Sequence, residues 1–414
     1  MKLLAVGDIH LGRVPVALPP GLAETARSLG PEAAWQRCIE QAISLKVEAV
    51  LLAGDVVDRE RDFFAGYNAL KAGIETLVKH GIRVIAVAGN HDTEVLPRLA
   101  DALPALQLLG RGGAWECLEL SEATIVGWSF PTRRVTRSPL ETFPEHDPPR
   151  PCLGLLHCDR DQADSAYAPV RSAELEAAPV DAWLLGHVHQ PDLDGMHRPI
   201  GYLGSVSALR ASETGMRGPW LVEIDGRSVR ADQIVLAPLA FDALELDVTA
   251  LEQPTDLDGA VLAAGKRQVA ARINNNALPD ALGLRIRLTG EHPAATALGD
   301  TAREIVAQQP VFEESGCQVF VDKIETAVSA PLDLEALARQ PDPAGMLARD
   351  LLLLTGPDCD ARRRLVAEAR ERMQAAGAIA ELQPVADEIS TERAAERLTR
   401  VGHAALARLL EQRR

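Results

Sequence analysis

The stretch LLAVGDIH (residues 3–10) decides the fold class of this chain. In it a short apolar run ends at Gly7, and two polar residues, Asp8 and His10, come directly after it. Short runs of Val, Leu, Ile and Ala that end at glycine are typical of strands buried on both faces of a sheet. Further runs among the first 190 residues also end at Asp, Asn or His. They are AVLLAGD (49–55), VIAVAGNHD (84–92), CLGLLH (152–157) and AWLLGHVH (182–189).

Helical spacing between the runs predicts an α/β arrangement. A helix around residues 35–43 would link the first two runs, and another over residues 66–80 would link the next pair. Strands that alternate with helices form a partly parallel sheet covered by helices. Ligands of such sheets bind in the crevice at the carboxyl ends of the strands. We therefore expect the polar residues that end the runs to form one site.

These polar residues have the chemistry of metal ligands. In extended backbone, residues i and i+2 point to the same side, so Asp8 and His10 can hold one ion, and His187 and His189 one ion or two adjacent ones. Carboxylate, amide and imidazole together suit Mn, Fe or Zn better than Ca or Mg. The candidates are too many for one tetrahedral ion and suit two ions about 3.5–4 Å apart that share a carboxylate. They are Asp8, His10, Asp55, Asn90, His157, His187 and His189.

An ordinary polar role is the alternative for any single histidine. Half of the ten histidines of the chain, however, follow strand-like runs in this one pattern, which argues against chance. The remaining histidines are interpreted as surface residues, and Cys158 as a small buried residue rather than a nucleophile or ligand. These surface predictions concern His80, His146, His197, His292 and His403.

The order D-x-H, G-D-x-x-D, G-N-H-D, a lone histidine and G-H-x-H resembles that of the calcineurin-like metallophosphoesterases. The resemblance implies an α/β fold built on a β-sandwich flanked by helices, and a two-metal hydrolase. For one ion it implies the ligands Asp8, His10, Asp55 and His189. For the second it implies Asp55, Asn90, His157 and His187, so that Asp55 bridges the two ions.

The same resemblance implies roles for residues beside the ligands. His91 would contact the phosphate and protonate the leaving oxygen while a bridging water attacks in line, and Asp92 would orient His91. Many members of the family have a phosphate-contacting histidine at the position of Asp58, and that role does not transfer to an aspartate. We expect Asp58 instead to accept a hydrogen bond from a ligand histidine or from His91, and count it with His91 and Asp92 in the catalytic set.

Length and composition limit the remaining possibilities. A chain of 414 residues suits two or three domains. It has no apolar run long enough to span a membrane and begins with a strand rather than a signal peptide. Its six cysteines form no C-x-x-C pair, which is typical of a reducing compartment. We expect a cytoplasmic protein with no membrane association.

The net charge of −16 is unusual for a protein that binds nucleic acid, since phosphate backbones are bound mostly by Lys and Arg. The metal ions would supply local positive charge, and a partner subunit could supply more. The loop FPTRRVTRSP brings Arg133, Arg134 and Arg137 near the predicted site, where a solvated surface loop is an equally good interpretation. Arg13 is a further candidate for contacting phosphate.

Three segments are predicted: a catalytic domain over residues 1–238, an α/β capping domain over 239–330 with the pattern β-α-β-α-β, and a helical region over 331–414. In the last helix, Leu398, Val401, Ala405 and Leu409 form an apolar stripe, which either packs on its own domain or docks on a partner's coiled coil. The capping segment resembles that of the SbcCD-type DNA repair exonucleases, in which a following helical segment binds an SMC-like coiled-coil ATPase.

The sequence therefore predicts a two-metal DNA phosphodiesterase that uses Mn, with Fe or Zn as alternatives. It would act as an exonuclease, with endonuclease activity left open, in double-strand-break repair or DNA end processing together with an SMC-like ATPase. Its partners would be DNA and this ATPase, and a homodimer is left open. The alternatives are a phosphodiesterase of small molecules or cyclic nucleotides and a non-catalytic scaffold, although no ligand is missing.

Overall fold

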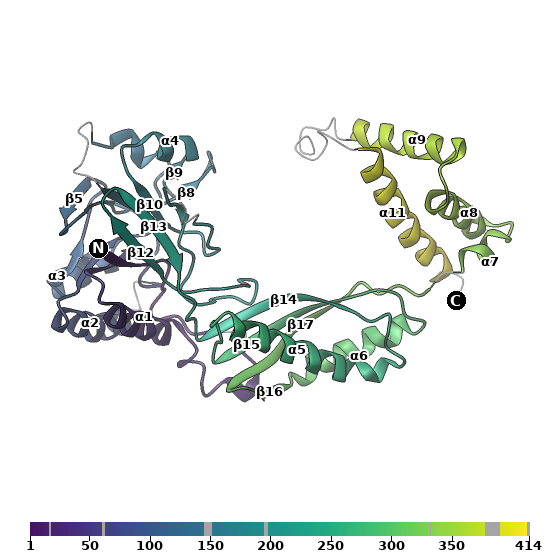
Figure 1. Cartoon of the computed structure of the whole chain (residues 1–414), viewed down its shortest axis with the longest axis horizontal. Coiled ribbons are helices and arrows are strands. Elements are labelled where there is room, and N and C mark those ends of the chain that lie inside the picture. Colours follow the sequence, from purple (N-terminus) through teal and green to yellow (C-terminus); the bar gives the residue numbers. More distant parts are fainter. Residues whose placement is uncertain are drawn as a thin grey trace. The chain divides into compact units, whose positions relative to one another are not determined.

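The computed structural model describes residues 1–15, 18–59, 63–144, 151–193, 198–331, 333–376 and 390–411 (Figure 1). His146 and His197, both predicted at the surface, lie outside the described residues.

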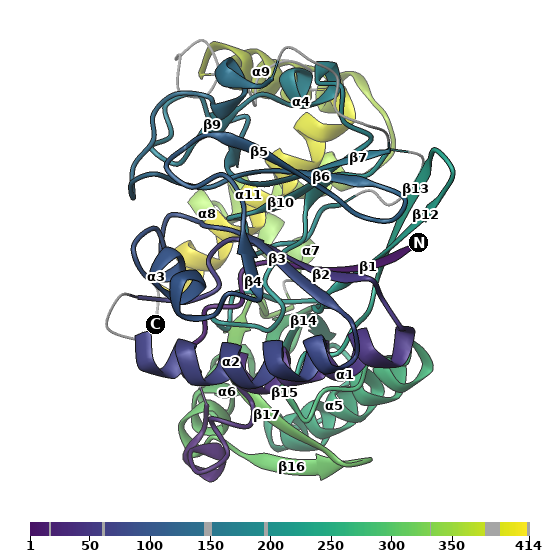
Figure 2. The ribbon, with the colours of Figure 1, turned by 90° about the vertical axis from the view of Figure 1, so that its left-hand side faces the viewer.

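Two β-sheets carry the ligand runs. A six-stranded sheet has the order β13-β12-β1-β2-β3-β4, and a five-stranded sheet has the order β11-β10-β7-β6-β5 (Figure 2). The first consists of β1 (Lys2–Val6), β2 (Ala49–Ala53), β3 (Arg83–Val87), β4 (Leu106–Leu108), β12 (Trp220–Asp225) and β13 (Ser228–Gln233). The second consists of β5 (Trp115–Glu119), β6 (Thr124–Trp128), β7 (Cys152–His157), β10 (Ala182–Gly186) and β11 (Ile200–Tyr202).

The strands that carry the ligand runs, namely β1, β2, β3, β7 and β10, are almost entirely apolar, and both of their faces are buried. On the inner face, Leu3, Leu51 and Ile85 of the first sheet pack against Leu155 and Leu184 of the second. The residues between them point outward, where helices cover them. The runs thus end on two facing sheets rather than on one open sheet, as the sandwich implied by the family resemblance requires.

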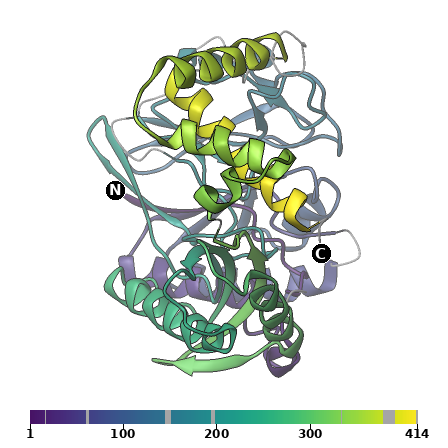
Figure 3. The ribbon, with the colours of Figure 1, turned by 90° about the vertical axis from the view of Figure 1, so that its right-hand side faces the viewer.

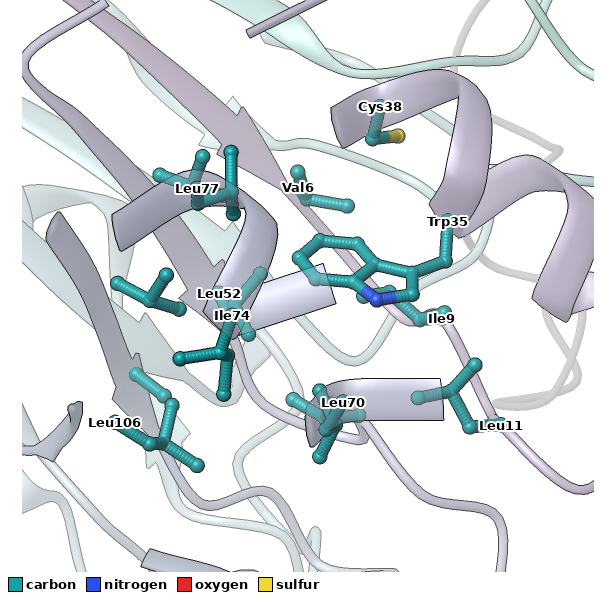
Figure 4. Packing of buried hydrophobic residues seen from close by; sticks show 14 of the residues in the cluster. Val6, Ile9, Leu11, Trp35, Cys38, Leu52, Leu70, Ile74, Leu77 and Leu106 are labelled. Carbon is teal, nitrogen blue, oxygen red and sulfur yellow. The ribbon is translucent and has the colours of Figure 1, made fainter. Parts of the chain in front are cut away.

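Three helices pack on the outer face of the six-stranded sheet, namely α1 (Pro31–Leu45), α2 (Phe63–Lys79) and α3 (Val95–Ala102). Trp35 of α1 lies between Val6 of the sheet and Leu70 and Ile74 of α2 (Figure 4). The short helix α4 (Ser172–Ala177) contributes Leu175 to the outer core of the five-stranded sheet, and the two-residue strands β8 (Asp159–Arg160) and β9 (Pro169–Val170) pair beside it. The predicted helices at 35–43 and 66–80 correspond to α1 and α2.

Residues 239–330 contain a separate four-stranded sheet with the order β14-β15-β17-β16. Its strands are β14 (Leu239–Asp247), β15 (Ala281–Thr289), β16 (Val311–Glu314) and β17 (Cys317–Thr326), and its helices are α5 (Leu257–Asn274) and α6 (Ala295–Gln308). The predicted β-α-β-α-β pattern omitted β16, which pairs with β17 through a turn at Ser315 and Gly316, both with positive φ. His292, predicted at the surface, is instead only 3% exposed and contacts the Leu251 carbonyl, because it lies under the loop that follows β14.

The C-terminal segment is a helical bundle of α7 (Leu334–Ala338), α8 (Pro343–Thr355), α9 (Asp360–Ala376) and α11 (Thr391–Glu411), coloured green to yellow in Figure 3. Of the two alternatives for the predicted stripe on α11, packing within the bundle is wrong for Val401, and docking on a partner stays a prediction. Val401 is 63% exposed, whereas Ala394, Gly402 and Leu406 are buried. Gly402 allows α11 to approach Leu351 of α8, so small residues define the contact face.

The chain divides into two compact units. Unit 1 comprises Met1–Leu246, Asp258–Arg287 and Ala302–Glu325, and unit 2 comprises Asp247–Leu257, Leu288–Thr301 and Thr326–Arg414. The predicted boundaries at 238/239 and 330/331 do not coincide with this division. Among the described residues, no helix is both long and apolar enough to cross a membrane.

Candidate metal centre

All of the predicted ligands meet where the strands of the two sheets end. Asp8 and His10 follow β1, Asp55 follows β2 and Asn90 follows β3, while His157 ends β7 and His187 and His189 follow β10. Three groups of these side chains and His91 have ligand atoms that all lie within 4.8 Å of one another. The groups are Asp8 with His10 and His189, His10 with Asp55 and His91, and Asp8 with Asp55 and His157.

The backbone at this centre is held in a conformation that ordinary residues rarely adopt. The φ angles of Asp8, His10, Asp55 and His187 are 36°, 55°, 48° and 104°. Positive φ in a residue with a Cβ costs free energy and persists only where surrounding contacts enforce it, most often at functional sites. Gly89 lies so close that a Cβ there would stand 2.2 Å from Asp55 Oδ1.

The hydrogen bonds of His157 leave one of its nitrogens available for a ligand. Nδ1 lies 3.0 Å from the Ala53 carbonyl, to which it can only donate, so Nε2 carries a lone pair. That Nε2 lies 3.0 Å from Asn90 Oδ1 and 3.5 Å from Asp55 Oδ2. Three electron-rich atoms facing one another at these distances fit a cation placed between them.

His10 and His189 show the same arrangement. The Nδ1 of His10 lies 3.0 Å from Asp58 Oδ1, and the Nδ1 of His189 lies 2.8 Å from Glu213 Oε1. Both Nδ1 atoms therefore donate, and the two Nε2 atoms face each other at 3.2 Å. Two lone pairs this close require a cation or a proton between them, which fits the donor set to a divalent ion.

The carboxylates around His10 determine whether a proton or a metal ion lies between the two Nε2 atoms at low pH. Burial lowers the pKa of His10, but the hydrogen bond to Asp58 and the charges of Asp55 and Asp8 outweigh it and raise the pKa above its ordinary value. Below that pKa a proton takes the position of the ion. Metal binding at this centre must therefore weaken as the pH falls.

Asp55 lies between the two halves of the centre. Its Oδ2 is 3.8 Å from His10 Nε2 and 3.5 Å from His157 Nε2, and its Oδ1 accepts the backbone N–H of His91 at 2.9 Å. Although burial would raise the pKa of Asp55, the imidazoles of His157 and His10 and the hydrogen bond lower it, so the carboxylate stays ionised. This position suits a bridging ligand.

The structure corrects the role predicted for Asp92. Its carboxylate accepts the backbone N–H groups of Gly89 at 2.8 Å and Val56 at 2.7 Å, not the ring of His91. The His91 Nδ1 is held by the backbone carbonyl of Asp58, 3.0 Å away. Asp92 is completely buried and cannot reach the exposed imidazole, because the loop after β3 is folded around it. Its function is to join the loops after β2 and β3.

Asp58 accepts hydrogen bonds from both of the histidines that the sequence suggested. Its side chain accepts from His10, and its main-chain oxygen accepts from His91. Its carboxylate also lies 3.6 Å from a guanidinium nitrogen of Arg13 and 3.2 Å from one of Arg59.

Two acidic residues that orient ligand histidines were missed. Glu213 accepts from His189, and Asp159 Oδ1 lies 3.5 Å from His187 Nε2. Asp159 follows His157 by two residues, a spacing that could have suggested it, whereas Glu213 lies in a loop with no motif. Burial lowers the pKa of His187 and favours the neutral ring, the form in which an imidazole binds a metal.

Two clefts open on the centre, and His91 lines both. One, of about 510 Å³, is lined by Asp58, Arg59, Asn90, His91, Arg133, Arg134 and Tyr167. The other, of about 380 Å³, is lined by His10, Arg13, Asp55, His91, His187, His189, Arg210, Ser212 and Glu213. The exposed side chains of Arg133, Arg134 and Arg210 form no ion pair with any described residue. Arg137, from the same loop as Arg133, lines neither cleft.

Comparison with known proteins relates two segments of the chain to known families. Residues 1–191 match the family described as calcineurin-like phosphoesterase, and residues 241–329 match the family described as the middle domain of metallophosphoesterase YhaO. Residues 1–191 are therefore similar to the calcineurin-like phosphoesterases, whose members are metal-dependent hydrolases with a two-metal centre. The α/β fold that the motifs implied is confirmed.

The relatives are distant. The chain is 26% identical to the uncharacterised metallophosphoesterase YhaO of Bacillus subtilis over 241 residues, which are 53% of this chain and 58% of that protein. It is 26% identical to the DNA double-strand break repair protein Mre11 of Haloferax volcanii over 360 residues, which are 83% of this chain and 72% of that protein. For Mre11 of Aeropyrum pernix, the identity is 25% over 60% of this chain and 64% of the relative. The chain thus spans less than two thirds of YhaO and of the Aeropyrum protein.

Among solved structures, a dimetal phosphatase from Danio rerio covers 57% of this chain and 98% of its own, with 14% identity and a TM-score of 0.35.

Proposed function

We propose that this protein is a two-metal phosphodiesterase that cleaves DNA. One observation supports the proposal most strongly, namely the three exposed arginines without ion pairs to any described residue, Arg133, Arg134 and Arg210, at the rims of the clefts. In a chain with a net charge of −16, such cations in two clefts that share His91 suit a substrate that carries several phosphates. The similarity to Mre11 proteins supports the same substrate.

The side chains of the centre supply the parts that such a reaction needs. When bound, two divalent ions would acidify a water molecule for in-line attack and polarise the phosphate. Asp8, His10, Asp55 and His189 would hold one ion, and Asp55, Asn90, His157 and His187 the other. His91, with its Nδ1 fixed by the Asp58 carbonyl, keeps Nε2 for the phosphate and, when protonated, for the leaving oxygen. Arg13 and Arg59 lie beside Asp58, where they can contact neighbouring phosphates.

The first experiment measures cleavage of linear single- and double-stranded DNA with Mn²⁺, with Mg²⁺ or with EDTA, beside an Asp55→Ala control. We expect Mn²⁺-dependent cleavage that disappears in the control. Hydrolysis of bis(p-nitrophenyl) phosphate without cleavage of DNA would contradict the proposal and favour a small-molecule phosphodiesterase. No hydrolysis of either substrate would favour the non-catalytic scaffold.

A second experiment tests the arginines. The double variant Arg133→Ala, Arg134→Ala should bind DNA more weakly, and the slope of log K against log salt should fall by about 0.7–0.9 for each phosphate that is no longer neutralised. Arg137→Ala is the matched control, since this arginine lies in the same loop but lines neither cleft. Equal effects of both changes would assign the binding to overall charge.

We also infer that the helical bundle binds an SMC-like coiled-coil ATPase. The exposed Met346 of α8 and Val401 of α11, 61% and 63% accessible, offer apolar contacts to such a partner. Val401→Glu should weaken co-purification with the ATPase without reducing hydrolysis of bis(p-nitrophenyl) phosphate. Unchanged co-purification would exclude this helix face.

A further inference from the structure

We propose that Glu213 is a positioning residue for His189, and that the second α/β segment (residues 239–330) holds Glu213 in place through Arg272. On this view the segment is a structural part of one metal site in addition to any role in covering it. The proposal rests on the ligand set given above and not on the identity of the substrate.

Glu213 has both of its carboxylate oxygens committed. Oε1 accepts from His189 Nδ1 at 2.8 Å, and Oε2 accepts the backbone N–H of Leu209 at 2.8 Å. Its side chain is only 11% exposed. A carboxylate fixed at both oxygens sets the tautomer and the rotation of the imidazole, and directs Nε2 towards the ion.

Arg217 fixes the loop that carries Glu213. It is 1% exposed, its Nε donates to the Glu213 carbonyl at 3.0 Å, and its Nη1 donates to Ser205 Oγ at 2.9 Å and to the carbonyl of His189. The buried guanidinium of Arg217 therefore links the backbone of His189 to the backbone of Glu213.

The next contact leads to the second α/β segment. Arg272 of α5 is 2% exposed, pairs with Asp242 of β14 at 2.9 and 2.6 Å, and donates from Nη2 to the Gly215 carbonyl at 3.2 Å. Gly215, with a φ of 97°, donates its N–H to the Phe241 carbonyl at 2.9 Å. The turn two residues after Glu213 is thus held by the segment from both sides.

A shared core makes these contacts rigid. Phe241 and Phe320 of the segment pack in one cluster with Leu22, Leu29 and Ala208 of the catalytic domain. A displacement of the segment would therefore move the turn at Gly215, and with it Glu213 and the ring of His189. The ligands of the other ion have separate partners, since His157 is held by the Ala53 carbonyl and His187 lies beside Asp159. The effect should fall on one ion of the two.

The test measures binding of Mn²⁺ to the metal-free full chain by titration calorimetry, with circular dichroism to verify folding. For the wild type we expect two ions. Glu213→Ala should weaken one of them by about 10- to 100-fold and leave the other unchanged. Glu213→Gln, which keeps an acceptor oxygen, should restore most of the affinity.

The decisive variant is the double change Asp242→Asn, Arg272→Met, which removes a buried pair together and so leaves neither charge unpaired. It should weaken the same ion as Glu213→Ala does. The double change Asp322→Asn, Arg285→Met is the matched control, because it removes another ion pair, 3.5 Å long, of the same segment. If the double variant does not fold, Arg272→Lys takes its place, because this change keeps the positive charge but removes the bidentate pairing with Asp242.

The outcomes separate this proposal from the proposed function. Two unchanged affinities in a folded Glu213→Ala variant would overturn the role of Glu213. An effect of Glu213→Ala without any effect of the Arg272 variant would overturn the role of the segment. A wild type that binds no pair of ions would contradict the proposed function itself, whereas one that binds two ions but cleaves no DNA leaves this inference intact.

Discussion

His91 has its two nitrogens in different environments, and this determines what its loss should do. Nδ1 is held by the Asp58 carbonyl, and the ring lies at the junction of both clefts. His91→Ala should keep both ions, because His91 is not among the proposed ligands, and should lower kcat by about 10²-fold or more, as expected for loss of a general acid. Metal content and hydrolysis of DNA measure the two effects. The exposed His80 provides the control His80→Ala, and full activity in the His91 variant would refute its role.

Asp58 offers a prediction about pH. Burial alone would raise its pKa, but the hydrogen bond from His10 and the charges of His10 and Arg13 lower it to about 2. A pKa below the ordinary value of 3.8 means that the ionised carboxylate stabilises the folded chain above about pH 4, and that this contribution disappears as the pH falls towards 2. For the metal-free protein, Asp58→Asn should reduce the loss of thermal stability over this interval relative to the wild type. Asp225→Asn, at an exposed strand end, should leave the loss unchanged, and equal slopes for all three proteins would contradict the prediction.

At this scale, the sequence shows the ligands more clearly than the residues that orient them. Asp8 and His10 stand directly after β1, so the end of that strand brings them to the centre, although both have positive φ rather than the extended backbone expected from the sequence. Glu213 and Arg217 lie in a loop whose course depends on contacts with residues 241 and 272, distant in the chain. Asp92 was misassigned because adjacency to His91 in the sequence says nothing about the direction in which the side chain points.

Among the elements, α1 and α2 pack so closely that the addition of a single methyl group to Gly73 should disturb their contact. A Cβ on Gly73 of α2 would lie 2.6 Å from Ile39 Cδ1 and 2.6 Å from Trp35 Nε1, both on α1. Gly73→Ala should therefore destabilise the fold by about 1–3 kcal/mol through overpacking, although alanine favours helix. Gly259→Ala in α5 meets no atom within 4 Å and should instead stabilise by up to about 1 kcal/mol. Chemical denaturation measures both, and a stabilised Gly73 variant would show that the helices can separate.

The elements also show where periodicity fails as a guide. Buried strands such as β2 and β7 were identified because every residue is apolar up to the ligand. The contact face of α11 does not follow the apolar periodicity. Ala394 and Gly402 lie on it because small residues allow the neighbouring helices to approach closely, whereas the larger Val401 is exposed. The strand β16 was missed because it has four residues and little alternation in its burial.

For the molecule as a whole, the helical bundle has cores of its own. Leu351 packs with Leu406, and Leu354 packs with Val366 and Ala394. All of the proposed ligands and the described residues that line the two clefts of the centre precede residue 214. Deletion of residues 331–414 should therefore leave Mn²⁺-dependent hydrolysis of bis(p-nitrophenyl) phosphate unchanged, while co-purification with the ATPase should disappear. A truncated chain that unfolds would show that the bundle belongs to the catalytic core.

The placement of the ligands on two sheets has a consequence for the whole molecule. Asp8, Asp55 and Asn90 follow strands of one sheet, and His157 and His187 belong to strands of the other or follow them. An ion that is bound by residues of both sheets links them, so its binding stabilises the folded chain against thermal unfolding. At a free metal concentration of one hundred times Kd, each site adds about 2.7 kcal/mol to the free energy of unfolding. EDTA should therefore lower the melting temperature, and each divalent metal should raise it according to its affinity. The melting temperature of the intact chain would then rank candidate metals before any substrate is known. A melting temperature that no metal changes would mean that packing alone holds the two sheets together.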